Sequence, residues 1–167
     1  ICDAFGIIGA EVLDCGLAST PAMFMSTIFD EYSCDGAIMI TASHLPFQRN
    51  GMKFFDRNGG LNKVDIKEII TYAVENNFTS KAGGSVAEHD LISDYALFLR
   101  NLICERVNHP TNYNRPLSGL HIVVDAGNGS GGFYVSKVLE PLGANCEGSQ
   151  FLNPDGSFPN HIPNPED

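Results

Sequence analysis

The residues best suited to chemistry lie in the stretch ITASHLPFQRNGMK, which spans residues 40–53. It places Ser43, whose hydroxyl could accept a phosphoryl group, beside His44, with Arg49 and Lys53 further along the chain. A phosphoryl group on serine carries a charge of about −1.5 to −2 near neutral pH, which nearby cations would offset. Ser43 is therefore a candidate carrier of phosphate. The alternative is that Ser43 is only a polar residue in a turn, without a role in chemistry. The residue types alone leave both interpretations open.

The elements around Ser43 must bring these side chains together. Residues 37–41 (AIMIT) form an apolar run that predicts a buried strand, and Ser43 follows its carboxyl end, where open α/β sheets bind their ligands. Pro46 prevents the strand from continuing, and the Asn-Gly pair at 50–51 is a turn signal. The chain should therefore double back and bring Lys53 toward Ser43.

The pattern of apolar residues predicts an α/β fold built from three-layer βαβ units with a mixed sheet. The first strand–helix–strand passage has the size of one βαβ unit, and its helix should begin with Thr20 as N-cap and Pro21 as first helical residue. The expected strands are 11–15, 37–41, 52–56, 120–125 and 144–147, the expected helices are 21–33, 65–77, 91–107 and 132–142, and 82–88 is expected to be a loop.

A segment rich in proline and asparagine, residues 108–118, has the composition of a linker. We place a domain boundary there, with most of one domain in residues 1–115 and a second, truncated α/β unit in residues 116–167. The chain begins at Ile1 and ends at Asp167 in a tail rich in proline and asparagine, so both ends are expected to be cut.

Composition limits the partners. The chain has 167 residues and a net charge of −10, from 20 acidic and 10 basic residues, which argues against binding to nucleic acid or to an anionic membrane. A hydrophobic content of 43% and a charged content of 18% are typical of a globular chain. The five cysteines are scattered without a C-x-x-C pair, which favours a reducing compartment. We expect the cytoplasm or an organellar stroma or matrix, not secretion.

Three other patterns have bland explanations. Residues 127–132 (GNGSGG) satisfy G-x-G-x-x-G and could bind a dinucleotide, but a glycine-rich turn chosen for tight packing fits as well. Residues 56–62 begin like a calcium loop, yet Leu61 stands where that loop needs glycine, so a β-turn is the better explanation. The remaining histidines considered lack metal-ligand spacing and are expected at the surface or at caps: His89, His109 and His121.

Four ordered motifs carry a family resemblance. They are the active-site run 41–46 (TASHLP) followed by Asn50-Gly51 and Lys53, then 16–21 (GLASTP), 124–129 (VDAGNG) and 153–161 (NPDGSFPNH). Together they resemble the α-D-phosphohexomutase family of the bacterial-type pattern, which includes phosphoglucomutase, phosphomannomutase and phosphoglucosamine mutase. The matches extend over nearly the whole chain, and they displace the dinucleotide interpretation.

The resemblance implies a four-domain enzyme of which this chain holds most of domain I and the start of domain II. It implies that Ser43 is a phosphoserine that interconverts hexose 1-phosphate and hexose 6-phosphate through a sugar bisphosphate. It further implies that His44 and Lys53 assist proton transfer and hold phosphate. Substrate contacts are implied for Thr41, Arg49 and Asn50, and Mg²⁺ for one phosphoserine oxygen of Ser43, with its other ligands outside this chain.

Two departures from the family pattern matter. Leu45 stands where the family usually has Asn, which removes a hydrogen-bonding side chain near Ser43. The metal-binding D-G-D-G-D-R loop and the sugar-recognition and distal phosphate loops are absent from the sequence. We therefore expect the chain alone to be inactive, and the sugar stays undetermined. The competing hypothesis is a non-catalytic family member that binds a sugar phosphate or a protein partner.

Overall fold

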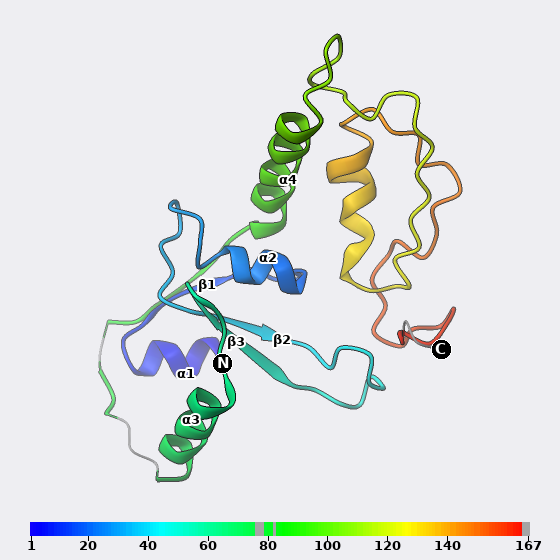
Figure 1. The fold of residues 1–167 in the computed structure, drawn as a ribbon. Coiled ribbons are helices and arrows are strands. Elements are labelled where there is room, and N and C mark those ends of the chain that lie inside the picture. The colour runs from blue at the N-terminus through cyan, green and yellow to red at the C-terminus, as the bar shows by residue number, and fades with distance from the viewer. Residues whose placement is uncertain (76–78, 82, 165–167) are drawn as a thin grey trace.

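The fold contains two small sheets with helices around them (Figure 1). A computed structural model describes residues 1–75, 79–81 and 83–164. Strand β1 (Glu11–Asp14) pairs in parallel with β5 (Ser85–Glu88), whereas β2 (Ala37–Ile40) pairs antiparallel with β3 (Met52–Asp56). A short strand, β4 (Gly59–Gly60), extends the second sheet. The predicted α/β class, with parallel and antiparallel pairing, is confirmed.

The pairing corrects two predictions. Residues 11–41 do not form a hydrogen-bonded βαβ unit, because β2 pairs with β3 and the parallel partner of β1 is β5. The predicted loop at 82–88 is wrong for 85–88, which form β5, while residue 82 lies outside the described residues. All four β5 residues are exposed and give no alternating pattern, so pairing with a distant strand, and not local sequence, makes this segment a strand.

The helix after β1 is shorter than predicted. Helix α2 (Thr20–Met25) has Ser19 as its N-cap, one residue before the predicted cap, and Ser19 Oγ accepts from the Ala22 N–H at 3.3 Å. The predicted extent to residue 33 is wrong, because the hydroxyls of Ser26 and Thr27 donate to carbonyls three residues back, at 2.7 and 2.8 Å. Such local bonds compete with the helical ladder, and turns follow.

The remaining domain I helices agree better with the sequence. Helix α4 (Leu91–Val107) has the predicted bounds. Helix α3 (Lys63–Glu75) begins two residues before the predicted start, and the predicted end at 77 lies outside the described residues. A first helix, α1 (Cys2–Ile7), was not predicted. No helix in the described part of the chain is long and apolar enough to cross a membrane.

The second unit is less regular than predicted. The expected strands 120–125 and 144–147 lie side by side in parallel through single bridges, His121 with Asn145 and Asp125 with Gln150, so they are not strands. Gly148, with φ +88°, lies between the bridging residues Asn145 and Gln150 and departs from the extended backbone that a continuous ladder needs. The expected helix 132–142 is a 3₁₀ turn (Ser130–Gly132) followed by the π-helix η2 (Tyr134–Leu139).

Helix α4 connects the two halves of the chain. One part of it packs against α2 through a cluster of Ala18, Ala22, Leu91, Ile92 and Tyr95. Another part packs beside η2 through Ala96, Cys104, Val138 and Leu142 (Figure 1). The second unit is therefore anchored on the same helix that completes the core of the first.

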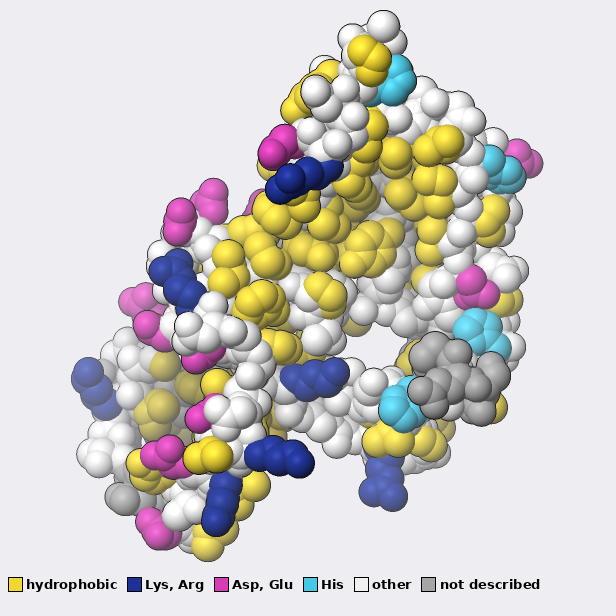
Figure 2. Space-filling model, viewed as in Figure 1, with side chains coloured by type: hydrophobic (Ala, Val, Ile, Leu, Met, Phe, Trp, Pro, Cys, Tyr) yellow, Lys and Arg dark blue, Asp and Glu magenta, His cyan; other side chains and the backbone are white. Residues whose placement is uncertain are grey.

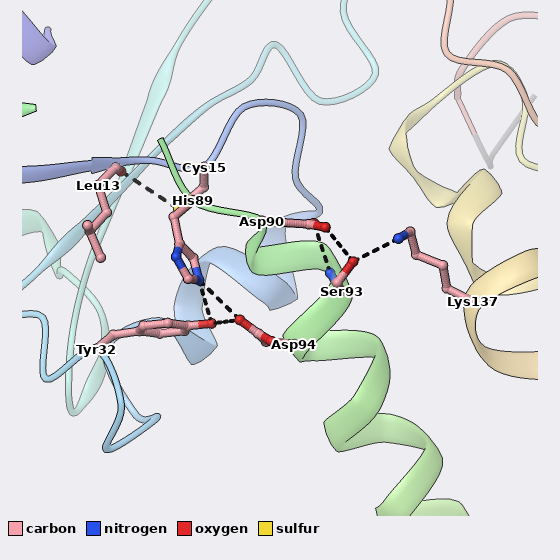
Figure 3. A network of polar contacts seen from close by, with 8 residues as sticks. All are labelled: Leu13, Cys15, Tyr32, His89, Asp90, Ser93, Asp94 and Lys137. Atoms are coloured by element: carbon pink, nitrogen blue, oxygen red, sulfur yellow. Dashed lines mark hydrogen bonds and ion pairs between the residues drawn. The ribbon is translucent and has the colours of Figure 1, made fainter. Parts of the chain in front are cut away.

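A polar network at the start of α4 reinforces this junction (Figure 3). Tyr32 donates to Asp94, and His89 Nε2 lies 2.8 Å from the Tyr32 hydroxyl and 3.1 Å from Asp94 Oδ2. Burial, and then the bond to Asp94, raise the pKa of Tyr32. His89 thus ties the chain after α2 to α4.

The same end of α4 is tied to the second unit. Asp90 caps the helix by accepting from the Ser93 N–H at 3.1 Å, and Lys137 Nζ of η2 donates to Ser93 Oγ at 2.8 Å (Figure 3). Further along α4, Arg100 Nη1 donates to the carbonyl of Lys137 at 2.5 Å. The two bonds to Lys137 tie η2 to α4.

Candidate active site

The turn that carries Ser43 is built from local hydrogen bonds. The ladder between β2 and β3 continues to Thr41, whose N–H donates to the Gly51 carbonyl at 3.0 Å. Thr41 Oγ1 accepts from the Ser43 N–H at 3.0 Å, and the Leu45 N–H donates to the Ala42 carbonyl at 3.1 Å. Ser43 is exposed and has φ +58°, a left-handed conformation that serine seldom adopts. Strained positions of this kind cluster at functional sites.

The hairpin returns Lys53 to the neighbourhood of the Ser43 strand, as the sequence predicts. Lys53 lies opposite Met39 in the ladder, and directly opposed side chains project to the same face of a sheet. Met39, Thr41 and Ser43 line a common open cavity of about 900 Å³. Lys53 is not among the residues that line it, so the ladder brings Lys53 beside β2 without placing it in the cavity wall.

The other predicted site residues lie in the exposed hairpin loop. His44, Arg49 and Asn50 are exposed and do not line the cavity. Asn50 Oδ1 accepts from the Gly51 N–H at 3.0 Å, which supports the turn signal of the sequence. Within the described residues, the side chains of Ser43, His44 and Lys53 form no hydrogen bond or ion pair with the protein, so they are available to a ligand.

The opposite wall of the cavity comes from the second unit. It consists of the 125–130 turn and parts of the segment 154–164, and Figure 2 shows the molecule hollowed between its two halves. The charged or ionisable side chains of this wall are Asp125, Asp155 and His161. The sequence did not predict that these stretches face Ser43, because residues 82 to 121 positions away from it give no local signal of that contact.

Asn128 joins the two segments of this wall. The residue is 9% exposed and has φ +58°, and its side-chain Nδ2 donates to the Asn153 carbonyl at 2.9 Å. Asn160 Nδ2 donates to Asn128 Oδ1 at 2.6 Å, and the Asp155 N–H donates to the Asn128 carbonyl at 2.8 Å. Every polar group of the Asn128 side chain is therefore used to hold segment 153–160 on the turn.

A second contact lies at the edge of the wall. His161 Nε2 lies 3.1 Å from Asp125 Oδ1, and His161 Nδ1 lies 3.1 Å from the Ile162 carbonyl. Hydrogen bonds to that carbonyl and to Asp125 raise the pKa of His161. The His161 bond, followed by the bond from the Gly127 N–H, lowers the pKa of Asp125.

Close packing explains two glycines of the glycine-rich turn. A Cβ on Gly127 would lie 2.8 Å from His161 Cε1, and a Cβ on Gly132 would lie 1.9 Å from the Leu152 carbonyl oxygen. The close approach of His161 and of the Leu152 carbonyl therefore requires glycine at these two positions. Of the sequence alternatives, tight packing explains these glycines.

A divalent cation does not find a complete set of ligands in the described residues. They contain no group of three His, Cys, Asp or Glu side chains that could hold a metal ion. Asp125 is engaged with Gly127, Gln150 and His161, and Asp155 accepts from Ser157.

All five cysteines are free thiols, and burial raises the pKa of Cys15, Cys34 and Cys146.

Two family profiles of known proteins match most of the chain. The family profile described as phosphoglucomutase/phosphomannomutase, alpha/beta/alpha domain I, matches residues 4–81, and that of domain II matches residues 98–167. The chain belongs to the phosphoglucomutase/phosphomannomutase family. The resemblance predicted from the four motifs is thereby confirmed.

Individual relatives agree with the assignment. The chain is 32% identical over 159 residues to the phosphoglucomutase of Neisseria meningitidis serogroup B, covering 94% of this chain and 31% of the relative. It is 32% identical over 166 residues to a phosphomannomutase of Escherichia coli, covering 94% of this chain and 34% of the relative. The chain thus spans about a third of the curated relatives it matches.

A solved structure shares the fold. The crystal structure of a phosphoglucomutase/phosphomannomutase family protein from Burkholderia thailandensis aligns with a TM-score of 0.76 at 27% identity, over 99% of this chain and 35% of that chain. The second family profile begins at residue 98, inside α4, where the cores of the two halves meet. The boundary at 115/116 stays a prediction.

Proposed function

We propose that the full-length protein containing this chain is a phosphohexomutase, an intramolecular phosphotransferase in which Ser43 carries the phosphoryl group. The observation that carries this proposal is the exposed Ser43, held with φ +58° at the end of β2 and lining the cavity shared by both halves. Membership of the phosphoglucomutase/phosphomannomutase family supports it. Phosphoryl transfer depends mainly on positioning and charge stabilisation, and a fixed hydroxyl in a cavity supplies the positioning.

The proposed reaction has two transfers. The bond between phosphorus and Ser43 Oγ breaks, and a new bond forms between phosphorus and a free hydroxyl of a hexose monophosphate. The proton of that hydroxyl leaves to a base, and Ser43 Oγ takes a proton to become a hydroxyl. The resulting sugar bisphosphate then changes its orientation in the cavity, so that its other phosphoryl group faces Ser43. Its other phosphoryl group then passes to Ser43 Oγ, whose proton leaves to a base, and the sugar oxygen that is released takes a proton. Ser43 is phosphorylated at the start and at the end.

The chain offers two groups for proton transfer and several for substrate. His44 and Lys53 are the candidates for moving the proton and holding the phosphate, since their side chains are free and lie on the hairpin of Ser43. Thr41, Arg49 and Asn50 are the candidates for substrate contact. Mg²⁺, if bound, would take a phosphoserine oxygen and neutralise charge on the phosphoryl group, and the rest of its coordination sphere would lie outside the described residues.

The substrate is proposed as a class. Relatives of equal identity are named for glucose and for mannose, so the comparisons favour neither sugar. We propose a hexose phosphate and its bisphosphate as ligands, with reversible transfer between the 1- and 6-positions. The test is turnover of hexose phosphates by the full-length protein: Ser43→Ala should abolish it, and an active Ser43→Ala protein would reject the proposal.

One observation favours a second candidate function. Leu45 is 46% exposed beside the nucleophile, where the family usually has Asn, so this loop lacks a polar side chain that others have. A non-catalytic protein that binds sugar phosphate or a protein partner is the alternative. Such a protein would bind a hexose phosphate without acquiring phosphate on Ser43, which mass spectrometry distinguishes from the enzyme.

A further inference from the structure

The contact between His161 and Asp125 has a chemistry of its own. Both partners of the imidazole ring are acceptors: the Asp125 carboxylate at 3.1 Å and the Ile162 carbonyl at 3.1 Å. A neutral imidazole has one N–H and can donate to only one of them, whereas an imidazolium donates to both. The geometry is therefore fully satisfied only when His161 is charged.

His161 also has contacts with the wall besides its hydrogen bonds, on a side chain that is 45% exposed. Its ring lies edge-on to Phe151, with centroids 5.7 Å apart, and Gly127 leaves room for it by lacking a Cβ. Asp125 is fixed in turn by the Gly127 N–H at 2.8 Å and by Gln150 Nε2 at 3.1 Å. The ring thus joins segment 154–164 to the 125–130 turn at the edge of the cavity that Ser43 lines.

The charge balance of the cavity gives this ring a second effect. Among the described residues that line it, His161 is the only side chain that can carry positive charge, and Asp125 and Asp155 are negative. Loss of the proton from His161 would leave two carboxylates facing the phosphoryl group on Ser43. The cavity would then be more negative, which disfavours binding of an anionic sugar phosphate. The wall would also lose the contact between His161 and Asp125 that holds it.

We propose that His161 is a positioning residue: as an imidazolium held between Asp125 and the Ile162 carbonyl, it fixes the cavity wall that faces Ser43 and keeps that wall receptive to a hexose phosphate. This inference rests on the proposed phosphohexomutase function for its substrate. The pair of contacts that His161 makes with Asp125 and with the Ile162 carbonyl, called the latch below, rests on the structure alone. Neither ring nitrogen is free to take part in proton transfer, so the role is to position and not to react.

The pH range in which His161 and Asp125 stay in contact follows from the directions of their pKa shifts. The pKa of His161 is raised above the ordinary value of 6.5 for an imidazole. The latch is therefore fully present at pH values below 6.5 and is lost as pH rises through the higher pKa of the folded protein. The lowered pKa of Asp125 means that the contact is present above 3.8 and is lost as pH falls through the lower value. The wall should therefore be fixed from mildly acidic to near-neutral pH.

The first experiment does not depend on activity. In the full-length protein, the Cε1–H resonance of His161 should titrate above the ordinary 6.5, and the amide resonances of Gly127 and Gly129 should move with the same midpoint. Asp125→Asn should lower the His161 midpoint, because it removes the carboxylate while retaining an oxygen for the Gly127 N–H. Titration of His161 at or below 6.5, or glycine amides that do not follow it, would overturn the proposal.

The second experiment uses turnover of a hexose phosphate. The value of kcat/KM should fall at alkaline pH with the His161 midpoint, and His161→Gln should remove that alkaline limb while lowering kcat/KM about 10- to 100-fold, mostly through KM. The double variant with Asp125→Asn should be no worse than His161→Gln alone. An alkaline limb that persists in His161→Gln would overturn the proposal.

A matched control is available in His121. Its Nε2 also lies 2.8 Å from a backbone carbonyl, that of Glu147, but it does not line the cavity. His121→Gln should leave kcat/KM and its pH profile unchanged, and a loss equal to that of His161→Gln would count against a specific latch. A wild-type protein without turnover would reject the proposed function, while the resonance titration would still decide on the latch.

Discussion

Thr41 Oγ1 accepts a hydrogen bond from the Ser43 N–H at 3.0 Å, and this bond stabilises the left-handed backbone of Ser43. The hydroxyl of one residue thus sets the direction of the next hydroxyl along the loop. Two further backbone bonds close the loop around it, from Thr41 to Gly51 and from Leu45 to Ala42. The orientation of Ser43 is therefore a property of the hairpin itself.

Replacing Thr41 by Val should loosen Ser43 while keeping the shape of the side chain. We expect a loss of about 0.5–1.5 kcal/mol in the free energy of unfolding, the usual net value of one hydrogen bond. In the full-length protein, kcat should fall about 10-fold, since small misplacements of a reacting group are costly. Urea unfolding and steady-state turnover measure the two effects.

Thr71→Val is the matched control for that variant. Thr71 Oγ1 donates to the Lys67 carbonyl at 2.9 Å on the exposed surface of α3, away from the cavity. Its removal should cost a similar free energy and leave kcat unchanged. An equal loss of kcat in both variants would show that Thr41 does not act through Ser43.

The backbone strain at Ser43 predicts an unusual ranking of two inactive variants. Glycine adopts φ +58° freely, whereas alanine meets the same steric penalty as serine. Ser43→Gly should therefore be more stable than Ser43→Ala by about 1 kcal/mol, although both lose the hydroxyl. Equal urea midpoints for the two variants would mean that the left-handed conformation is not strained.

Much of this site could be predicted from local sequence, and its limits have a physical cause. The strand 37–41, the Asn-Gly turn at 50–51 and the return of Lys53 depend on contacts within one hairpin, which short-range patterns encode. The pairing of β1 with β5 and the facing of Ser43 by the 125–130 turn depend on residues about 75 to 85 positions apart. No propensity encodes those contacts.

Errors in element length have the same origin. The hydroxyls of Ser26 and Thr27 end α2 early by bonding to nearby carbonyls, although the apolar spacing beyond them is helical. In the second unit, Gly148, with φ +88°, lies between the bridging residues Asn145 and Gln150, so no continuous strand forms there. Conversely, α4 was predicted with its observed bounds, because its Asp90 cap and its long apolar stripe agree.

Leu45→Asn tests the departure from the family pattern. Leu45 is 46% exposed, so the change should alter the free energy of unfolding by less than about 0.5 kcal/mol. A restored polar side chain near Ser43 should raise kcat/KM of the full-length protein by about 2- to 10-fold, the value of one net hydrogen bond. Leu120→Asn, at a side chain that is 50% exposed and does not line the cavity, should leave kcat/KM unchanged. A fall in kcat/KM in Leu45→Asn would mean that the loop has adapted to leucine.

The packing of α4 on both halves predicts that they unfold together. Leu142 is 1% exposed and packs in the cluster that joins α4 to η2, so Leu142→Ala should lower the free energy of unfolding by about 2–5 kcal/mol. Leu97→Ala on α4, where the side chain is 48% exposed, should cost far less. Hydrogen exchange should speed up in residues 91–107 as well as in 134–139; protection retained in α4 would contradict a shared core.

The most direct test of the central claim is the location of phosphate in the full-length protein. After incubation with a hexose bisphosphate, peptide mass spectrometry should find a single phosphoryl group on Ser43, and hexose monophosphate added afterwards should remove it as bisphosphate. Ser43→Ala should show neither phosphate nor turnover. A Ser43→Ala protein that still interconverts hexose phosphates would contradict the account.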